Sequence, residues 1–173
     1  LHKAIRRQRQ MCIRDRVYIN GTDIFAMNDD ELAIFRRRQV GIIYQFYNLI
    51  PILNVEENMA IPMELDGRKV EKAQMDDMLL RLGLTERRTH LPNELSGGQQ
   101  QRTSIGRALI TRPSIVLADE PTGNLDTKAS NEIMHLLKTS NRELNQTIIM
   151  ITHNMELAKA ADRTIMIEDG KIR

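Results

Sequence analysis

Ile115-Val116-Leu117-Ala118-Asp119-Glu120 is the stretch of sequence that most constrains the fold. Its four apolar residues are typical of a short strand covered on both faces, as in a parallel sheet. Two acids follow directly, at the carboxyl edge where ligands of α/β sheets bind. Asp119 could hold Mg²⁺ there, directly or through water, and Glu120 could orient or deprotonate an attacking water. A solvated acidic strand end is the simpler alternative, and this stretch alone does not separate the two.

The sequence on both sides of this stretch alternates between strand and helix patterns. Val40–Tyr44 and Thr147–Thr152 are the other clear strands, and Asp126 can cap a helix that runs to about Leu144. Strands that alternate with helices predict an α/β protein with a largely parallel sheet. Residues 48–110 lack strand patterns and are typical of a helical insertion. The remaining expected elements are strands at 17–21 and 163–167, and helices at 31–38, from 55 to Pro62, at 69–82, 99–110 and 155–161.

Particular residues mark where several of these helices begin or end. Asn54 is a plausible N-cap, with Glu57 three residues later as in a capping box. Gly83 lies where a helix C-cap belongs, and Pro113 ends the helix that precedes it.

Polar residues follow three separate strands at the point where each strand ends. Gln45 follows Val40–Tyr44, Asp119 and Glu120 end the second strand, and His153 follows Thr147–Thr152. Because parallel strands end at the same edge of a sheet, we expect these side chains to share one edge. A packed core histidine is the alternative for His153.

A second chemical motif is Leu95-Ser96-Gly97-Gly98-Gln99, which opens a predicted helix. Two glycines let a ligand approach the backbone, and the helix start offers unpaired N–H groups at a positive dipole end. With the Ser96 hydroxyl, these groups could form a cradle for phosphate. A serine N-cap after a glycine turn explains the same residues without a ligand, and both interpretations stay open at this point.

Taken together, these motifs resemble the ATP-binding-cassette ATPases, the ATP-hydrolysing subunits of ABC transporters. Leu95–Gln99 matches the family signature, and Ile115–Glu120 matches the Walker B strand with its catalytic Glu. Gly123–Asp126 matches the D-loop, Gln45 the Q-loop and His153 the switch histidine. The motifs occur in the family's order and at fitting spacing.

The resemblance extends over residues 17–173 and implies a P-loop NTPase (RecA-like) core with a largely parallel sheet and an inserted helical subdomain. Within the family, Gln45–Pro51 and Asp119–Asp126 are similar to the lipoprotein-releasing, macrolide-export and antimicrobial-peptide-export group. The domain organisation expected from this is a segment foreign to the domain at 1–16, the first part of the core at 17–47, the helical subdomain with the signature at 48–110, and the second part of the core at 111–173.

The resemblance also implies ATP and Mg²⁺ as ligands and assigns residues to them. Glu120 and His153 would be catalytic, and Gln45 and Asp119 would face the metal. The residues implied to bind nucleotide are Gln45, Ser96, Gly97, Gly98, Gln99, Asp119 and Asp126. Two ATPase subunits of this family form a head-to-tail dimer, and a transmembrane permease subunit would hold them at the cytoplasmic face of the cell membrane.

The sequence departs from the family pattern at two places. The family's P-loop motif, which cradles the phosphates, does not occur, and the first glycine of the chain is Gly21. We therefore expect the phosphate-binding front of the core to be missing here, with weak MgATP binding as a result. The second departure is Gly106 within the signature helix, where relatives usually have Ala, at a cost of up to about 1 kcal/mol in helix stability.

Other classes of ABC protein stay open as alternatives. A soluble ABC ATPase of DNA repair would carry long coiled coils between Gln45 and Leu95, for which the sequence leaves no room. A translation-associated ABC protein would hold two cassettes, whereas only one signature occurs. A catalytically incomplete fragment without the P-loop remains the strongest alternative.

Composition and charge limit the range of partners. The chain has 173 residues and a net charge of +2, but residues 1–16 hold six basic residues and one acid, so the rest carries −3. That segment is either a basic arm or a foreign segment, and the mildly acidic remainder argues against a nucleic-acid partner. Aromatic residues make up 3% and Cys12 is the only cysteine, so neither a base-stacking platform nor an internal disulfide is expected. No run of 18 apolar residues occurs, so we expect no membrane-spanning helix.

Overall fold

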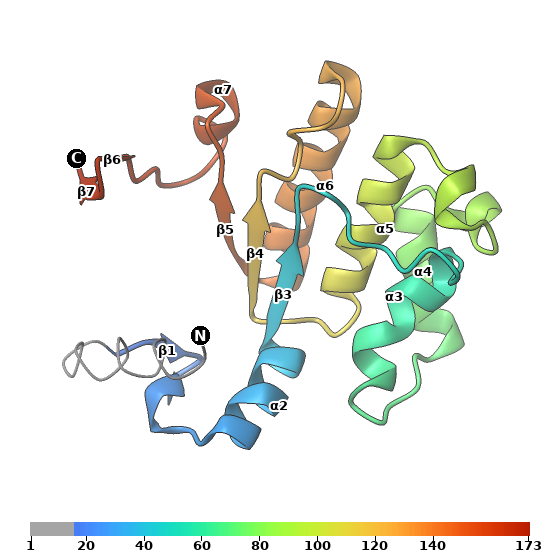
Figure 1. The fold of residues 1–173 in the computed structure, drawn as a ribbon, viewed down its shortest axis with the longest axis horizontal. Coiled ribbons are helices and arrows are strands. Elements are labelled where there is room, and N and C mark those ends of the chain that lie inside the picture. Colours follow the sequence, from blue (N-terminus) through green and yellow to red (C-terminus); the bar gives the residue numbers. More distant parts are fainter. Residues whose placement is uncertain (1–15) are drawn as a thin grey trace.

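A three-stranded parallel sheet forms the centre of the computed structural model, which describes residues 16–173 (Figure 1). Its strands are β3 (Val40–Ile43), β4 (Ile115–Asp119) and β5 (Thr147–Ile151), in the order β3-β4-β5. Ile43 is paired with Ala118, and Ala118 with Met150. The α/β class and the parallel sheet are confirmed, and all three strands end at one edge. The expected segment at 1–16 lies outside the described residues except for Arg16.

One face of this sheet is buried by two helices. Helix α5 (Gly97–Leu109) and helix α6 (Thr127–Leu144) supply Ile105, Ile133 and Leu137 to a common core with Val116 and Ala118 of β4. Asp126 caps α6 through a 2.8 Å bond from the N–H of Ala129, as the sequence predicts.

The opposite face of the sheet carries apolar side chains that are exposed. Ile42, Leu117, Ile149 and Ile151 alternate with the buried positions and lie on this second face. The prediction that Ile115–Ala118 is covered on both faces is therefore wrong for residues 16–173, because the helices that contact this strand all pack on the side of Val116 and Ala118.

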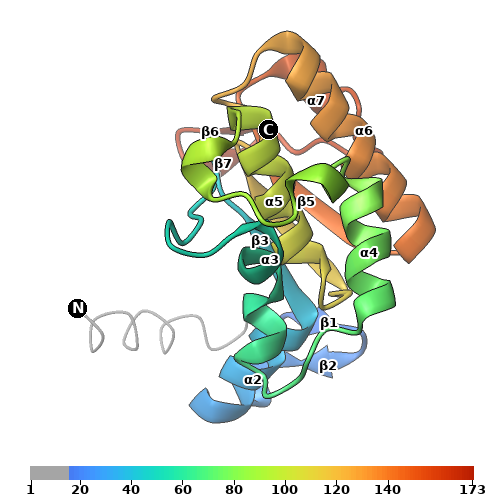
Figure 2. The same cartoon turned by 90° about the vertical axis from the view of Figure 1, so that its right-hand side faces the viewer.

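Helices α3 (Val55–Glu64), α4 (Lys72–Arg81) and α5 form the helical region expected within residues 48–110 (Figure 2). Asn54 and Glu57 close the predicted capping box of α3, and Gly83 has the positive φ of a C-cap glycine. The prediction that Pro62 ends the helix is wrong. Pro62 lies in the last turn, where its missing N–H removes one bond, and the helix continues until the Leu65 N–H donates to Ile61.

Gly106 has a packing role that the sequence did not show. A Cβ at this position would lie 2.7 Å from Leu82 Cδ1 and 2.7 Å from Met59 Cε, both of which are buried. The glycine therefore lets α5 approach α3 and the end of α4 closely, which offsets its low helix propensity. Two short 3₁₀ turns, at Thr85–Arg87 and Pro92–Glu94, connect α4 to α5.

The two ends of the described chain form hairpins outside the main sheet. At the start, β1 (Tyr18–Ile19) and β2 (Thr22–Asp23) pair across Asn20-Gly21, whose φ angles are both positive. The positive φ pair is the geometry that an Asn-Gly hairpin turn requires. A 3₁₀ turn (Ile24–Ala26) and helix α2 (Asp29–Gln39) then lead into β3.

The last segment contains helix α7 (Met155–Ala158) and strands β6 (Ile167–Glu168) and β7 (Lys171–Ile172). The predicted strand at 163–167 is wrong in extent: only Ile167 belongs to a strand, because β6 pairs with β7 alone, across Asp169-Gly170. No helix within residues 16–173 has both the length and the apolar content needed to cross a lipid bilayer.

Candidate functional site

The carboxyl edge of the sheet brings together the predicted residues that follow β3, β4 and β5. The loop after β4 is bonded to the end of β5 and to the loop after β3: the Glu120 N–H donates to Ile151 O (2.9 Å), and the Asn124 side chain donates to Gln45 O (3.0 Å). The expectation that Gln45, Glu120 and His153 share one edge is confirmed, since the His153 N–H also donates to Glu120 Oε1.

Glu120 and His153 form a directly bonded pair. Both the backbone N–H and the ring Nδ1 of His153 lie within hydrogen-bond distance of Glu120 Oε1, at 2.8 and 2.7 Å. Thr152 Oγ1 donates to the other carboxylate oxygen at 3.3 Å. The Glu120 side chain is 17% exposed, whereas the His153 side chain is 82% exposed. The carboxylate is thus held in a fixed orientation, and the imidazole is open to a ligand. This geometry disfavours a packed core histidine.

Glu120 has a left-handed backbone, with φ +44. A non-glycine residue in this region costs about 1–3 kcal/mol and persists where surrounding bonds determine it. Here the Glu120 N–H bonds to Ile151, and the N–H of Gly123 donates to Glu120 O at 3.0 Å. Both main-chain groups of the strained residue are therefore fixed, which sets the direction of its side chain.

Asp119 is the last residue of β4 and is exposed. A carboxylate here and the amide oxygen of Gln45 on the neighbouring loop are the hard oxygen donors that Mg²⁺ takes. Residues 16–173 contain no group of three or more His, Cys, Asp and Glu side chains that could by themselves hold a metal ion. The two oxygen donors fit Mg²⁺, which is usually bound by one or two carboxylates together with substrate phosphates.

The Gln45 side chain lies against the loop after β4. A Cβ on Gly123 would lie 2.9 Å from Gln45 Nε2, so a larger residue here would displace the Gln45 amide. Tyr47 and Asn48 follow Gln45 in the loop after β3, and their φ angles are +29 and +49. Arg107 of α5 donates to the carbonyl oxygens of both residues, at 2.7 and 2.6 Å. Burial lowers the pKa of the Arg107 guanidinium, because the charged form loses contact with water. The bonds to the two carbonyl groups are thus made at a cost in solvation.

Ser96 begins α5 and closes a capping box with Gln99. The Gln99 N–H donates to Ser96 Oγ (3.3 Å), and the Ser96 N–H donates to Gln99 Oε1 (2.9 Å). The N-cap interpretation of Ser96 is thereby confirmed. The N–H groups of Gly97 and Gly98 still lie in the first turn, where a helix offers no carbonyl partner, so the cap is compatible with a phosphate site.

The two glycines face different neighbouring segments. A Cβ on Gly97 would lie 3.0 Å from the Tyr47 hydroxyl, and one on Gly98 would lie 3.5 Å from Ala129 Cβ. The first turn of α5 is thus next to the loop after β3 and the start of α6. Asp126, also assigned to nucleotide, is exposed at that same helix start.

Sequence reasoning missed three residues that hold these loops, namely Asn58, Gln101 and Arg107. Asn58 and Gln101 are fully buried polar side chains that bond to backbone groups. The partners of Asn58 lie in the loop just before its own helix, whereas those of Gln101 are carbonyl groups distant in sequence. The sequence signal that could have identified these residues is a polar residue on the inward face of the amphipathic helices α3 and α5.

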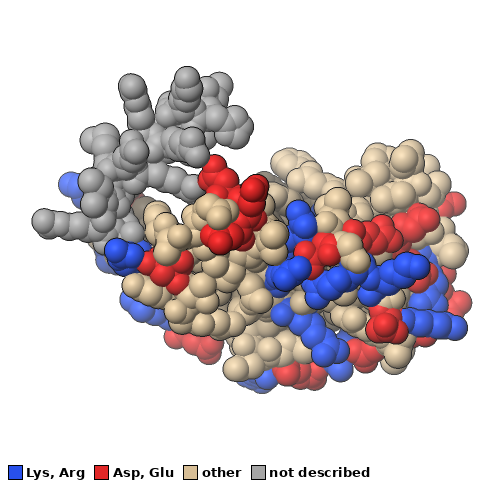
Figure 3. Space-filling view, turned by 90° about the horizontal axis from the view of Figure 1, so that it is seen from below, with Lys and Arg blue, Asp and Glu red and all other residues tan. Residues whose placement is uncertain are grey.

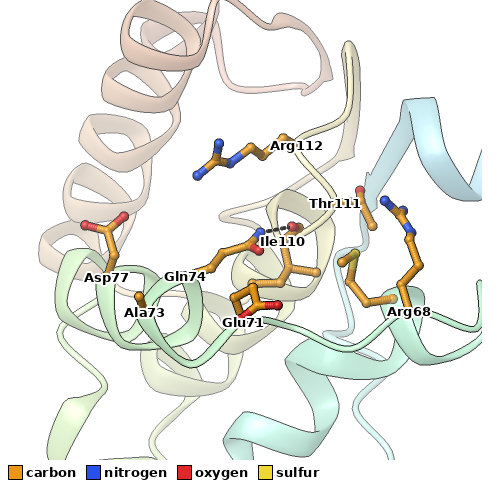
Figure 4. A pocket seen from close by; sticks show the side chains of 9 residues that line it. Arg68, Glu71, Ala73, Gln74, Asp77, Ile110, Thr111 and Arg112 are labelled. Atoms are coloured by element: carbon orange, nitrogen blue, oxygen red, sulfur yellow. Dashed lines mark hydrogen bonds between the residues drawn. The ribbon is translucent and has the colours of Figure 1, made fainter.

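A cavity of about 540 Å³ lies apart from these loops, between α4 and the connection from α5 to β4 (Figure 4). Arg68, Glu71, Asp77 and Arg112 line it, and Gln74 donates to Ile110 O at 2.6 Å. Its charges are balanced, and none of the predicted site residues lines it.

Comparison with known proteins identifies the family. Residues 1–123 match the family described as ABC transporter. The ABC transporter ATP-binding protein YtrE of Bacillus subtilis is 46% identical over 162 residues, which cover 92% of this chain and 70% of that protein. The lipoprotein-releasing system ATP-binding protein LolD of Cytophaga hutchinsonii is 44% identical over 158 residues, covering 90% and 72%.

Solved structures agree with this. The ATP-binding cassette MJ0796, in a dimeric post-hydrolysis state bound to ADP and Pi, superposes with a TM-score of 0.79 at 37% identity, covering 92% of this chain and 72% of that one. A second dimeric structure of MJ0796 gives a TM-score of 0.77 at 38% identity, with the same coverage. The chain therefore belongs to the ABC transporter family and has the fold of its ATP-binding cassette. The predicted ABC ATPase fold and family are confirmed.

Proposed function

We propose that this protein is the ATP-hydrolysing subunit of an ABC transporter, which couples ATP-driven closure of a dimer to transport by a membrane partner. The observation that carries the proposal is the fixed pair of Glu120 and His153 at the carboxyl edge of the parallel sheet. The fold and the family support ATP as the ligand.

The chemistry at this edge follows from the positions of the acids. Glu120, held by Thr152 and His153, has a carboxylate oriented to position a water for attack on a terminal phosphate. The exposed imidazole of His153 is available to hydrogen-bond that phosphate. Asp119 and Gln45 would hold Mg²⁺, which neutralises phosphate charge when bound.

The signature residues 96–99 act across a dimer in this proposal. Ser96 is exposed, and Gly97 and Gly98 present the positive end of α5. Such a group can bind phosphate held by a second copy when two chains meet head to tail, so that nucleotide joins the two subunits. The dimeric structures of MJ0796, one of them bound to ADP and Pi, support the pairing of two such subunits.

A groove of about 440 Å³ lies between α2, β3, α3 and α5. Its lining supports our proposal that a transmembrane permease subunit binds this protein. Ile42, Tyr44, Ile61 and Leu65 give it an apolar lining, and Arg36 and Arg37 lie at its side. We propose that an apolar segment with an acidic residue from the permease docks here.

The loop beside this groove extends the same surface. Phe46 is 70% exposed and Ile52 is 83% exposed, which is unusual for large apolar side chains in one short segment. Docking to a permease would place the protein at the cytoplasmic face of the cell membrane. We propose lipoprotein or peptide export as the transport class, and the name of the lipoprotein-releasing relative LolD supports the first of these.

The alternative of a catalytically incomplete chain rests on a different observation. The P-loop motif does not occur in the printed sequence, and apolar residues of the second sheet face are exposed. Calorimetry with MgATP on the 173-residue chain tests it: weak binding is expected, and micromolar affinity would contradict the alternative.

The test of the proposed function is Glu120→Gln in the assembled transporter. We expect ATP binding to be preserved and phosphate release to stall, because the amide cannot accept a proton from water. Glu132→Gln is the matched control, since Glu132 lies on the exposed side of α6 and pairs with Arg102. Phosphate release from Glu120→Gln near the wild-type rate would refute the assignment.

A further inference from the structure

Gln101 links α5 to two loops of the candidate site, although it lies inside the helix. Its side chain is fully buried, and its Nε2 donates to Pro121 O at 2.7 Å and to Tyr44 O at 3.4 Å. One side chain of α5 thus bonds this helix both to the segment after β4 and to the residue after β3.

The orientation of this amide is determined by its neighbours. Both nearby groups are carbonyl oxygens, which only accept hydrogen bonds, so the NH₂ group must face them. Gln101 Oε1 is then buried without a hydrogen-bond partner within residues 16–173. A buried polar atom without a partner costs free energy. An apolar side chain would avoid that cost, so packing alone does not explain a glutamine here, whereas the two carbonyl bonds do.

The loops held by Gln101 carry the candidate site residues. Tyr44 directly precedes Gln45, and Pro121 directly follows Glu120. Further along α5, Arg107 holds the next part of the first loop through Tyr47 O and Asn48 O. The helix that begins at Gly97 is therefore hydrogen-bonded to both loops.

We propose that Gln101 is a positioning residue that fixes Glu120 and Gln45 relative to the first turn of α5. Its functional meaning rests on the proposed function, in which that first turn binds a phosphate across the dimer. Movement of α5 on phosphate binding then passes through the Gln101 amide to the backbone beside Glu120. The side chain touches neither ligand nor reacting atoms, so it acts only through these loops.

The test replaces Gln101 by methionine, which has a similar length and no donor. Thr103→Val is the matched control, because Thr103 is also fully buried in α5 and its hydroxyl donates only to Gln99 O of the same helix, at 2.9 Å. Both variants lose buried hydrogen bonding, but only Gln101→Met loses bonds to the loops.

Amide hydrogen exchange of the 173-residue chain is the first measurement. In Gln101→Met we expect the amides of Glu120, Gly123 and Leu125 to exchange about tenfold faster, as loss of a buried hydrogen bond implies. Amides in the middle of α6 should change only with global stability, which urea denaturation measures separately. Unchanged loop exchange, or a uniform rise that follows global stability, would overturn the proposal.

The NMR resonances of His153 provide a readout that general destabilisation does not move. Its backbone N–H and its ring both contact Glu120 Oε1. We expect these resonances to shift in Gln101→Met and to stay in place in Thr103→Val. Equal shifts in both variants, or none in either, would overturn the proposal. These measurements need no nucleotide, so they stand apart from the outcome of Glu120→Gln.

Discussion

Asn58 is a fully buried amide in α3, and Asn58→Asp tests whether it organises the exposed loop before the helix. Its Nδ2 donates to the carbonyl oxygens of Ile50, Leu53 and Asn54, at 3.1, 2.7 and 3.0 Å. Its Oδ1 accepts from the Ile50 N–H at 2.8 Å. Aspartate has the same size but replaces the donor with an oxygen that faces three carbonyl groups.

The size of the effect follows from the hydrogen bonds that the substitution removes. A protonated carboxyl group keeps one donor, so at low pH the variant leaves some of the three carbonyl groups without a hydrogen bond. The expected loss in the free energy of unfolding is about 1–3 kcal/mol. An ionised carboxylate is also a buried charge without a partner, which raises the cost to about 3–5 kcal/mol. That is a large part of the roughly 5–15 kcal/mol that stabilises a domain.

The pH dependence has a definite sign. Burial among carbonyl oxygens raises the pKa of the introduced carboxyl group above its unfolded value of about 3.9. The destabilisation is then smallest below pH 3.9 and grows with pH, by at most about 1.4 kcal/mol per unit, until the pH passes the folded pKa.

Urea denaturation of the wild type and the variant between pH 4 and 7 measures this difference. Asn54→Asp is the matched control, because Asn54 Oδ1 only accepts, from the Glu57 N–H at 2.9 Å, and a negative charge at a helix start is favourable. The control should be neutral or slightly stabilising at pH 7. A loss for Asn58→Asp below about 1 kcal/mol, or one that does not change with pH, would refute the reasoning.

Two further substitutions test how the sheet and α2 are joined to the rest. Gly41→Ala should destabilise the fold by about 1–3 kcal/mol, because the new Cβ would lie 2.5 Å from the backbone oxygen of Ala108. Gly98→Ala is the control, since a Cβ there meets nothing closer than 3.5 Å. Equal melting temperatures for the Gly41→Ala and Gly98→Ala variants would contradict this prediction. Asp66 forms ion pairs with three arginines, chiefly with Arg38, whose hydrogen bond lowers the pKa of Asp66. On the face seen from below, Lys and Arg lie interspersed with Asp and Glu (Figure 3). The wild type should therefore exceed Asp66→Asn in stability at neutral pH, and the difference should shrink as the pH falls below the ordinary aspartate pKa of about 3.9. A difference that does not shrink as the pH falls below about 3.9 would contradict this account.

The order of elements and the shared edge could be predicted because they depend on local patterns. Val40–Tyr44, Ile115–Ala118 and Thr147–Thr152 are apolar or β-branched runs separated by helix patterns, which is sufficient for a parallel sheet. The caps at Asn54, Ser96 and Asp126 were equally local. The strand at 163–167 failed because its pairing depends on a partner strand, which periodicity does not identify.

The sequence by itself determined the class of fold and the order of the motifs, and it pointed to Glu120 and His153 as candidate site residues, since each follows from residues within a few positions of one another. The tertiary structure decided how those residues are held. The strained backbone of Glu120, the donation of Gln101 to Tyr44 and Pro121, and the contact of Gln45 with Gly123 join segments 20 or more residues apart. Such contacts depend on the packing of α5 against the sheet, so no local pattern in the chain specifies them.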